Sequence, residues 1–237
     1  MDNNFFPKSI EQKNLHLFII RSSILKAIKW VLPELKGDLL DIGCGKMPYR
    51  EFIIENSEVK NYVGLDIETA LVYDQDIKPD FTWDGKNMPF ENAKFNCAFA
   101  TEVLEHCPEP EIFLKETYRV LKPDSSFFFT VPFLWNLHEV PYDEYRYTPF
   151  SLKRHLLNSG FSDVEIYATG GWHLAMAQML GLWVKRAHIP TFKRKIIEKM
   201  VLIIMKKLIR ISKVEKIEFK GGQMITGLYG VAKKKSE

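Results

Sequence analysis

The sequence predicts an α/β fold built on a doubly wound, mainly parallel β-sheet. Short apolar runs alternate along the chain with segments of helical period, as expected when helices connect parallel strands. The first apolar run, 39–42, breaks at the turn Gly43-Cys44-Gly45, and a helix can begin a few residues later. A second apolar run closes on Asp66 after the length of one βαβ unit, which predicts that the two strands are parallel neighbours.

The other elements follow in chain order, and several are bounded by residues that end helices. A leading helix stops at Pro33, the helix before the fifth strand closes at Lys122-Pro123, and a later helix ends at Ser159-Gly160. The pattern becomes helical again from 172 to 213, so these helices form an insertion before the last strand. The predicted helices are 9–32, 48–55, 109–121 and 150–157, and the predicted strands are 39–42, 62–66, 81–83, 97–100, 127–131, 164–168 and 224–232.

Length and composition favour a single globular unit. The chain has 237 residues, of which 46% are hydrophobic, enough for one full core with an appended segment. We expect one domain with four parts, which are a helical segment at 1–36, a ligand-binding core at 37–170, a basic helical insertion at 171–220, and a last strand with its tail at 221–237.

Basic residues are concentrated in the insertion. The segment from Lys185 to Lys216 contains eleven Lys and Arg but only two Glu, which gives it a net charge of about +9. Because the net charge of the whole chain is +3, the other residues together carry about −6. Over 192–213 the pattern predicts a basic amphipathic helix, which can cover a sheet edge, form a homodimer contact or lie on an anionic membrane. No nucleic-acid partner is expected, because the helix lacks a helix-turn-helix context. The predicted apolar face consists of Ile197, Met200, Val201, Ile204, Leu208 and Ile211.

Cysteine usage and the apolar runs indicate a cytoplasmic protein. Cys44, Cys97 and Cys107 lack the paired spacing of a disulfide framework or zinc site, so we expect reduced thiols. Residues 1–7 lack the basic region and apolar run of a signal peptide. No window reaches the ~18 uncharged apolar residues of a membrane span. Peripheral contact with the inner face of the membrane remains open through the basic helix.

The carboxyl ends of the first two predicted strands carry groups typical of a ligand site. Ligands of open α/β sheets bind where the strand order reverses, and Asp41, the glycine turn and Asp66 all fall there. Glycines let the backbone approach a ligand, and a carboxylate can accept hydrogen bonds from both hydroxyls of a ribose. Pro48 replaces the third glycine of a dinucleotide fingerprint, which favours a nucleoside ligand without a pyrophosphate.

These motifs, together with three later ones, make the sequence similar to the class I S-adenosylmethionine-dependent methyltransferases over most of the chain. The five motifs occur in order at 39–45, 62–66, 84–90, 100–106 and 116–124. The resemblance implies a Rossmann-like sheet of seven strands with an antiparallel last strand, and S-adenosyl-L-methionine as cofactor. Met47 and Pro48 stand where the family often has a third glycine. The implied cofactor contacts are Asp41, Gly43, Cys44 and Gly45 at the methionine part, Asp66 at the ribose, Ile67, Asp84 and Gly85 at the adenine, and Thr101 beside the methionyl end.

The segment 132–148 follows the fifth predicted strand and should overhang the same pocket. It crowds aromatic rings and charged side chains into a loop, an arrangement suited to a substrate lid. Trp135, Tyr142 and Arg146 are candidates for contact with the methyl acceptor, although aromatic residues can equally pack in the core. The segment is also similar to a subgroup met in bacterial cell-surface polysaccharide pathways, which implies a small, sugar-linked or lipid-linked acceptor.

Methyl transfer to a hydroxyl needs a base but no acid, because the departing thioether is neutral. Imidazole titrates nearest to neutrality, so His138 in the lid is the first candidate base and His106 after the fourth strand is the second. Either histidine can instead make a structural hydrogen bond. No metal is expected, because the acids around His138 do not match a known ligand spacing and Pro141 breaks any helix there.

Two other functions fit the same residues. A catalytically inactive partner protein that still binds S-adenosylmethionine would also retain Asp41 and Asp66. A nicotinamide-dependent oxidoreductase would share the fold, but Pro48 disfavours it. Binding of S-adenosylhomocysteine rather than NAD, followed by a test for methyl transfer, separates these possibilities.

Overall fold

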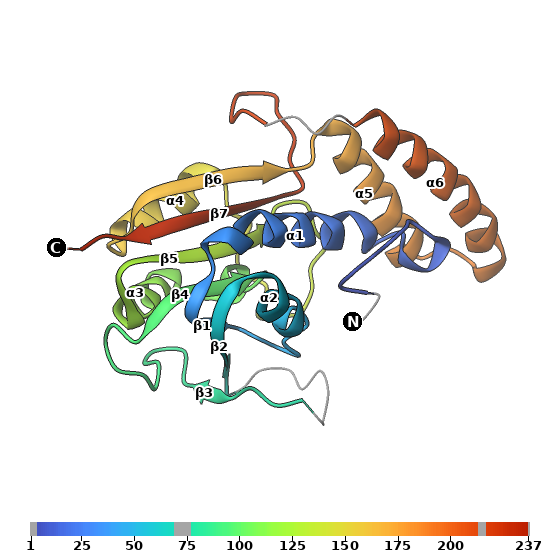
Figure 1. Ribbon diagram of the computed structural model, residues 1–237. Helices are drawn as coiled ribbons and strands as arrows, with labels where there is room; N and C mark the ends of the chain where they lie inside the picture. Colours follow the sequence, from blue (N-terminus) through green and yellow to red (C-terminus); the bar gives the residue numbers. More distant parts are fainter. Residues whose placement is uncertain (1–3, 69–76, 213–216, 237) are drawn as a thin grey trace.

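A computed structural model describes residues 4–68, 77–212 and 217–236. The described residues form one seven-stranded sheet (Figure 1). Its strands are β1 (Lys36–Ile42), β2 (Glu58–Ile67), β3 (Phe81–Trp83), β4 (Phe95–Thr101), β5 (Leu121–Pro132), β6 (Ser162–Thr169) and β7 (Gly227–Lys234). Their order across the sheet is β3-β2-β1-β4-β5-β7-β6, with parallel pairing from β3 to β5 and β7 antiparallel to both neighbours. The predicted mainly parallel sheet with an antiparallel last strand is confirmed.

Helices cover both faces of this sheet (Figure 1). Residues of α3 and α4 join one buried cluster, and residues of α1 and α2 join the cluster on the opposite face. The strand order reverses between β1 and β4, so the ligand site expected of such a sheet lies at the carboxyl end of β1. The helices are α1 (Phe18–Val31), α2 (Arg50–Asn56), α3 (Pro110–Val120), α4 (Pro149–Asn158), α5 (Trp172–Arg186) and α6 (Thr191–Ile211), with short 3-10 helices η1 (Gln12–Asn14), η2 (Leu32–Glu34) and η3 (Leu104–His106).

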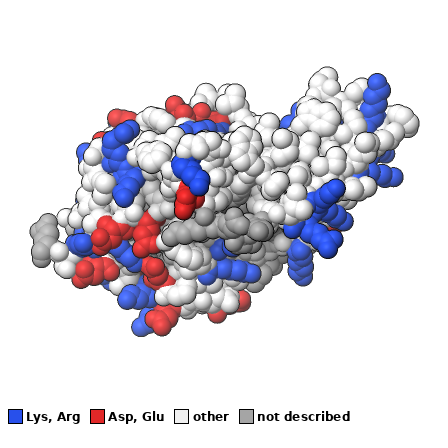
Figure 2. Space-filling model, turned by 90° about the horizontal axis from the view of Figure 1, so that it is seen from above, with Lys and Arg blue, Asp and Glu red and all other residues white. Residues whose placement is uncertain are grey.

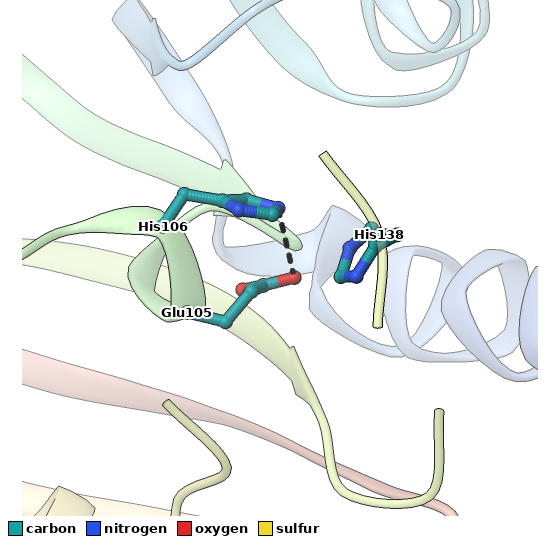
Figure 3. A group of neighbouring side chains, drawn as sticks. All are labelled: Glu105, His106 and His138. Carbon is teal, nitrogen blue, oxygen red and sulfur yellow. Dashed lines mark ion pairs between the residues drawn. The ribbon is translucent and has the colours of Figure 1, made fainter. Parts of the chain in front are cut away.

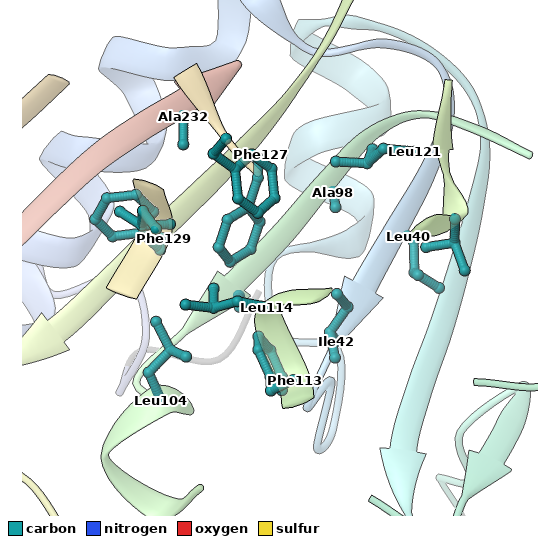
Figure 4. Packing of buried hydrophobic residues seen from close by; sticks show 14 of the residues in the cluster. Leu40, Ile42, Ala98, Leu104, Phe113, Leu114, Leu121, Phe127, Phe129 and Ala232 are labelled. Carbon is teal, nitrogen blue, oxygen red and sulfur yellow. The ribbon is translucent and has the colours of Figure 1, made fainter. Parts of the chain in front are cut away.

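The central strand β5 shows how one apolar run serves two cores. Successive side chains of a strand point to opposite faces. Phe127 and Phe129 accordingly pack in the cluster under α3 and α4 (Figure 4), whereas Phe128 packs in the cluster under α1 and α2. All three rings are fully buried. A strand buried on both faces reads as a continuous apolar run, which is why the sequence pattern located it.

Two predicted boundaries are wrong by six residues or more. The leading helix was predicted from residue 9, but α1 begins at Phe18, and the preceding residues include only the short helix η1. Strand β5 begins at Leu121 rather than 127, directly after α3. Pro123 is tolerated there because the pairing of β7 with β5 starts only at Ser125, so the missing N–H costs no bond to that neighbour.

The helices α5 and α6 pack on each other beside the sheet and share a third apolar cluster. On the face drawn in Figure 2, Lys and Arg side chains occur over both ends of the molecule, whereas the acidic side chains are concentrated at the end away from α5 and α6. Part of the predicted apolar face of α6 is wrong, because Met200, Ile204 and Ile211 are exposed. Val201 points inward as predicted, together with Met205, which the prediction does not include. Lys213, the last residue of the predicted range, lies outside the described residues. None of the described helices is long and apolar enough to cross a bilayer.

Candidate active site

The glycine turn after β1 is built around the end of β2. The amides of Gly43 and Cys44 donate to the carbonyl of Leu65 at 2.8 and 3.1 Å. The amide of Gly45 donates to Oδ2 of Asp66 at 2.9 Å. Gly43 has a φ of +71°, and a Cβ there would lie 2.6 Å from Cγ2 of Val103. Glycine is therefore required at Gly43 both by the backbone conformation and by the close segment after β4.

Asp66 closes β2 with a half-buried carboxylate. Burial raises its pKa, although the amides of Gly45 and Ile67 favour the charged form. Each carboxylate oxygen has a second lone pair beyond the bond it already accepts, so the group can also accept from the two hydroxyls of a ribose. The turn and the carboxylate thus fit the nucleoside cofactor that the sequence predicts.

Asp41 lies deeper than its neighbours in the motif. Its side chain is 3% exposed and accepts a hydrogen bond of 2.5 Å from the buried hydroxyl of Tyr62. Burial, with a smaller contribution from the nearby charge of Asp66, raises the pKa of Asp41 to about 7, although the bond from Tyr62 opposes this rise. The two acids therefore lie close together at this edge of the sheet, as the sequence predicts. A direct contact of Asp41 with the cofactor stays a prediction. Cys44 is buried beside them, and burial raises the pKa of its thiol.

The predicted adenine side lies at the ends of β2 and β3. Ile67 is 39% exposed after Asp66, and a Cβ on Gly85 would contact its Cδ1 at 3.4 Å. The carboxylate of Asp84 accepts from the amides of Lys86 and Asn87, which lowers its pKa and shapes the turn. An exposed apolar side chain next to a backbone with no Cβ provides a flat surface for a ring.

The segment after β5 brings His138 next to His106, which lies in η3 after β4. The rings of His106 and His138 are 4.7 Å apart between centroids and meet edge to face. Nδ1 of His106 is 3.0 Å from the carbonyl of Tyr142, and Nδ1 of His138 is 3.2 Å from Oδ2 of Asp143. Asp143 is held in turn by two bonds from Arg146, of 2.6 and 2.8 Å. Desolvation lowers the pKa of His138, and the carboxylate of Asp143 partly opposes this effect.

The other predicted contacts lie near this segment in different settings. Thr101 is half-buried at the end of β4. Trp135 packs partly buried against the cluster under α1 and α2, so its ring serves the core at least in part. Tyr142 is 58% exposed and presents its ring to solvent. Arg146 orders the loop through Asp143 rather than projecting freely.

Glu105 is a site residue that the sequence did not single out. Its carboxylate is fully buried in η3 and forms a close group with His106 and His138, in which one ligand atom of each lies within 4.8 Å of the others (Figure 3). Burial and the nearby charge of Glu102 raise the pKa of Glu105. The sequence held one usable signal, because Glu102, Glu105 and His106 follow directly on β4, at the edge where ligands bind.

Glu139 interacts both with His106 and with Asp66, which is the residue predicted to hold the ribose of the cofactor. Oε2 of Glu139 is 3.7 Å from Nε2 of His106, and the charge of Glu139 raises the pKa of Asp66. Residues 40–129, which include the glycine turn, Asp66 and η3, match the methyltransferase domain family. The chain contains a class I S-adenosylmethionine-dependent methyltransferase domain.

Sequence similarity to a curated protein extends over about half of the chain. A stretch of 131 residues is 31% identical to an uncharacterized protein of Methanocaldococcus jannaschii. The match covers 53% of this chain and 47% of that protein, so the chain spans about half the length of the curated relative it matches.

Solved structures of other methyltransferases share the fold. A chain of the Haloferax volcanii complex between the Trm112 methyltransferase activator and a methyltransferase gives a TM-score of 0.58 at 15% identity, covering 95% of this chain and 94% of that one. A methyltransferase of Archaeoglobus fulgidus gives 0.54 at 17% identity, covering 94% and 95%. Haemonchus contortus phosphoethanolamine N-methyltransferase 2, solved with S-adenosylhomocysteine, gives 0.56 at 12% identity, covering 99% and 60%. Their common feature is the architecture of the methyltransferase domain.

Proposed function

We propose that the protein transfers the methyl group of S-adenosyl-L-methionine to an oxygen atom of a small, sugar-linked or lipid-linked acceptor. The proposal depends on one observation, which is that His106 lies 3.7 Å from Glu139, whose charge acts on Asp66. The two imidazoles therefore lie at the same carboxyl edge of the sheet as the carboxylate that would hold the ribose. The cofactor supplies an electrophilic methyl carbon on its sulfonium, and the protein must align the acceptor and exclude water.

The acceptor hydroxyl must lose its proton as the new C–O bond forms. His138 is suited to take that proton, because desolvation lowers the pKa of its ring and so favours the neutral form, while the carboxylate of Asp143 lies 3.2 Å from Nδ1. His106 is the second candidate, with Nδ1 fixed by the carbonyl of Tyr142. The departing S-adenosylhomocysteine is neutral and needs no acid.

The chemistry of the lid suits an acceptor with an apolar or ring-shaped surface. Leu137, Val140 and Tyr142 are exposed by 75, 70 and 58% on the segment that follows β5. Apolar groups in such a position can contact a sugar ring or a lipid chain. Together with the similarity of this segment to enzymes of cell-surface polysaccharide pathways, this supports an acceptor of that kind and a cytoplasmic location.

We also propose that α5 and α6 attach the protein to the inner face of the membrane. The outward side of α6 carries Ile196, Met200 and Ile203, exposed by 51, 58 and 69%, with basic residues along both sides. The neighbouring helix adds the exposed rings of Trp172 and Trp183. Apolar side chains flanked by Lys and Arg favour an anionic bilayer surface, where a lipid-linked acceptor would be found. A homodimer through the same face is the alternative.

Calorimetry tests the proposed function first. We expect S-adenosylhomocysteine to bind and NAD not to bind. Incubation with methyl-labelled cofactor and a cell extract, fractionated into lipids, glycans and small molecules, should then place the label in one fraction. Binding without any transfer would indicate an inactive partner protein, and binding of NAD would indicate an oxidoreductase. Failure to bind S-adenosylhomocysteine would contradict the proposal.

A further inference from the structure

The buried carboxylate of Glu105 lacks the partners that such a group requires. It is 0% exposed, and neither carboxylate oxygen has a hydrogen-bond partner among the described residues. The nearest ring nitrogen, Nε2 of His106, is 3.8 Å from Oε1 and too far for a hydrogen bond. Burying a charged group without donors is strongly unfavourable, and such groups are normally paired or coordinate a metal.

The two histidines next to Glu105 are arranged in the way that metal ligands are. A ligating histidine usually directs its other ring nitrogen at a carbonyl or carboxylate, which fixes the ring. Nδ1 of His106 is 3.0 Å from the carbonyl of Tyr142, and Nδ1 of His138 is 3.2 Å from Oδ2 of Asp143. Nδ1 of His106 is thus occupied, whereas Nδ1 of His138 faces the carboxylate of Asp143 but has no hydrogen-bond partner among the described residues. We take Nε2 of each ring as the coordinating atom.

The spacing of the three side chains suits a single ion. One ligand atom from each of Glu105, His106 and His138 lies within 4.8 Å of the others (Figure 3). Nitrogen and oxygen ligands about 2.1 Å from one ion are separated by roughly 3.5 Å, so small rotations of the side chains complete the coordination. Oε2 of Glu139 lies 3.7 Å from Nε2 of His106 and is close enough to contribute a further oxygen.

The local charge also favours a cation. Besides Glu105 itself, two carboxylates lie near the group: the charge of Glu102 acts on Glu105, and Glu139 pairs with His106. The positive charge of Arg146 reduces this negative potential. The guanidinium of Arg146 is, however, already paired with the carboxylate of Asp143 at 2.6 Å. A cation among the two imidazoles and Glu105 would neutralise the buried carboxylate without disturbing that pair.

We propose that Glu105, His106 and His138 bind one divalent cation of the borderline class, such as Mn²⁺, Co²⁺ or Zn²⁺, at the acceptor side of the cofactor site. Two imidazoles with one carboxylate select these ions over Mg²⁺ and Ca²⁺, which prefer oxygen ligands. Three protein ligands leave positions open for a substrate oxygen. The cation would lower the pKa of an acceptor hydroxyl, whose proton then passes to water, so that His138 acts as a ligand in place of the base role proposed for it above. This catalytic role rests on the proposed function, namely methyl transfer to an oxygen atom.

Titration of the full chain with metal ions tests the site directly. After treatment with a chelator and dialysis, the protein should bind one equivalent of Mn²⁺ or Zn²⁺ in calorimetry. Co²⁺ should give the visible absorption of a site with nitrogen and oxygen ligands. Glu105→Gln and His138→Gln should each weaken the binding at least 10-fold. His155→Gln is the matched control, because His155 also faces a carboxylate, Glu111 at 3.4 Å, and belongs to no ligand group among the described residues.

The outcomes separate the metal site from the proposed function. The proposal is overturned if the wild-type chain shows neither stoichiometric binding nor the Co²⁺ absorption, or if both substitutions leave the affinity unchanged. The wild-type result stands even if a variant fails to fold. S-Adenosylhomocysteine binding is measured on the same metal-free protein, so its loss would contradict the cofactor site alone. Metal binding without methyl transfer would remove only the catalytic role of the ion.

Discussion

At the scale of single residues, two neighbouring acids have different tasks. Asp66 is half-buried at the mouth of the glycine turn, where it accepts from the amides of Gly45 and Ile67. Asp41 lies beneath it and accepts from the buried hydroxyl of Tyr62. The more exposed Asp66 can accept further hydrogen bonds from a ligand, whereas Asp41 also supports the end of β1 through Tyr62, and its own contact with the cofactor stays a prediction. Burial explains the difference, because an accessible group exchanges its partners for those of a ligand more readily than a buried one.

Asp66→Ala tests the cofactor contact. Loss of hydrogen bonds to a charged group costs about 1.5 to 3 kcal/mol, so the affinity for S-adenosylhomocysteine should fall about 10- to 100-fold. Calorimetry measures this directly. Asp163→Ala is a suitable control, because that exposed acid on β6 pairs only with Lys235 among the described residues. An unchanged affinity in Asp66→Ala would show that the cofactor binds elsewhere.

Asp41→Asn tests the buried acid through the pH dependence of stability. The folded-state pKa of Asp41 is raised to about 7, mainly by burial, from an ordinary value of 3.8. The folded protein therefore holds this proton over a range in which the unfolded chain has released it. Its contribution to stability is greatest below pH 4 and is lost as the pH rises to about 7.

The Asn side chain can still accept from Tyr62 but does not titrate. Urea unfolding between pH 4 and 7 should therefore show a shallower fall in the free energy of unfolding for Asp41→Asn than for the wild type. The slopes should differ by up to about 1.4 kcal/mol per pH unit. Equal slopes would mean that Asp41 is already ionised in the folded protein.

At the scale of the element, α6 has three faces rather than two. Val201 and Met205 pack against the neighbouring helix α5, and Lys185 of α5 pairs with Glu198 at 2.7 Å. A second side presents exposed apolar residues, among them Ile203. Lys and Arg occupy much of the remainder. A helix that needed only to cover the protein would not require the outer apolar side, which is why we assign it to a membrane.

Sedimentation with anionic vesicles tests the role of α6. The wild-type chain should bind at low salt and bind less at high salt, since each cation near the surface contributes about 1 kcal/mol that salt screens. Lys207→Gln should weaken binding about fivefold, and Ile203→Ser should weaken it at both salt concentrations. The exposed Lys115 on α3 provides the control Lys115→Gln, which should bind like the wild type.

Two results of the sedimentation would contradict the membrane assignment. The first is the absence of vesicle binding at either salt concentration. The second is equal binding by Ile203→Ser and the wild-type chain. A dimer detected in solution and lost in Ile203→Ser would instead favour the homodimer.

At the scale of the whole molecule, the functional parts lie on different elements of one sheet. The residues proposed to bind the cofactor follow β1, β2 and β3, whereas the two candidate histidines come from η3 and from the segment after β5. The parallel order β3-β2-β1-β4-β5 brings all these carboxyl ends to one edge. The basic helices lie beside the sheet, so membrane attachment and methyl transfer can occur on separate surfaces of the same molecule (Figure 1).

Much of this architecture was readable from the residues alone. The strands 39–42 and 62–66, the glycine turn, the acid at Asp66 and the insertion before the last strand all depend on local patterns of polarity and on glycine, which act within a few residues. The helix start at Phe18 and the inward face of α6 were misread, because they depend on which neighbours those helices pack against.

The tertiary structure alone revealed the group of Glu105, His106 and His138. Its members come from two separate segments, and no spacing within either segment matches a known ligand motif. Likewise, only the packing of Asp41 against Tyr62 separated the buried acid from the accessible one. Local sequence patterns specify the strands and turns because they depend on nearby residues. The chemistry of a side chain depends on its burial and its partners, which distant segments supply.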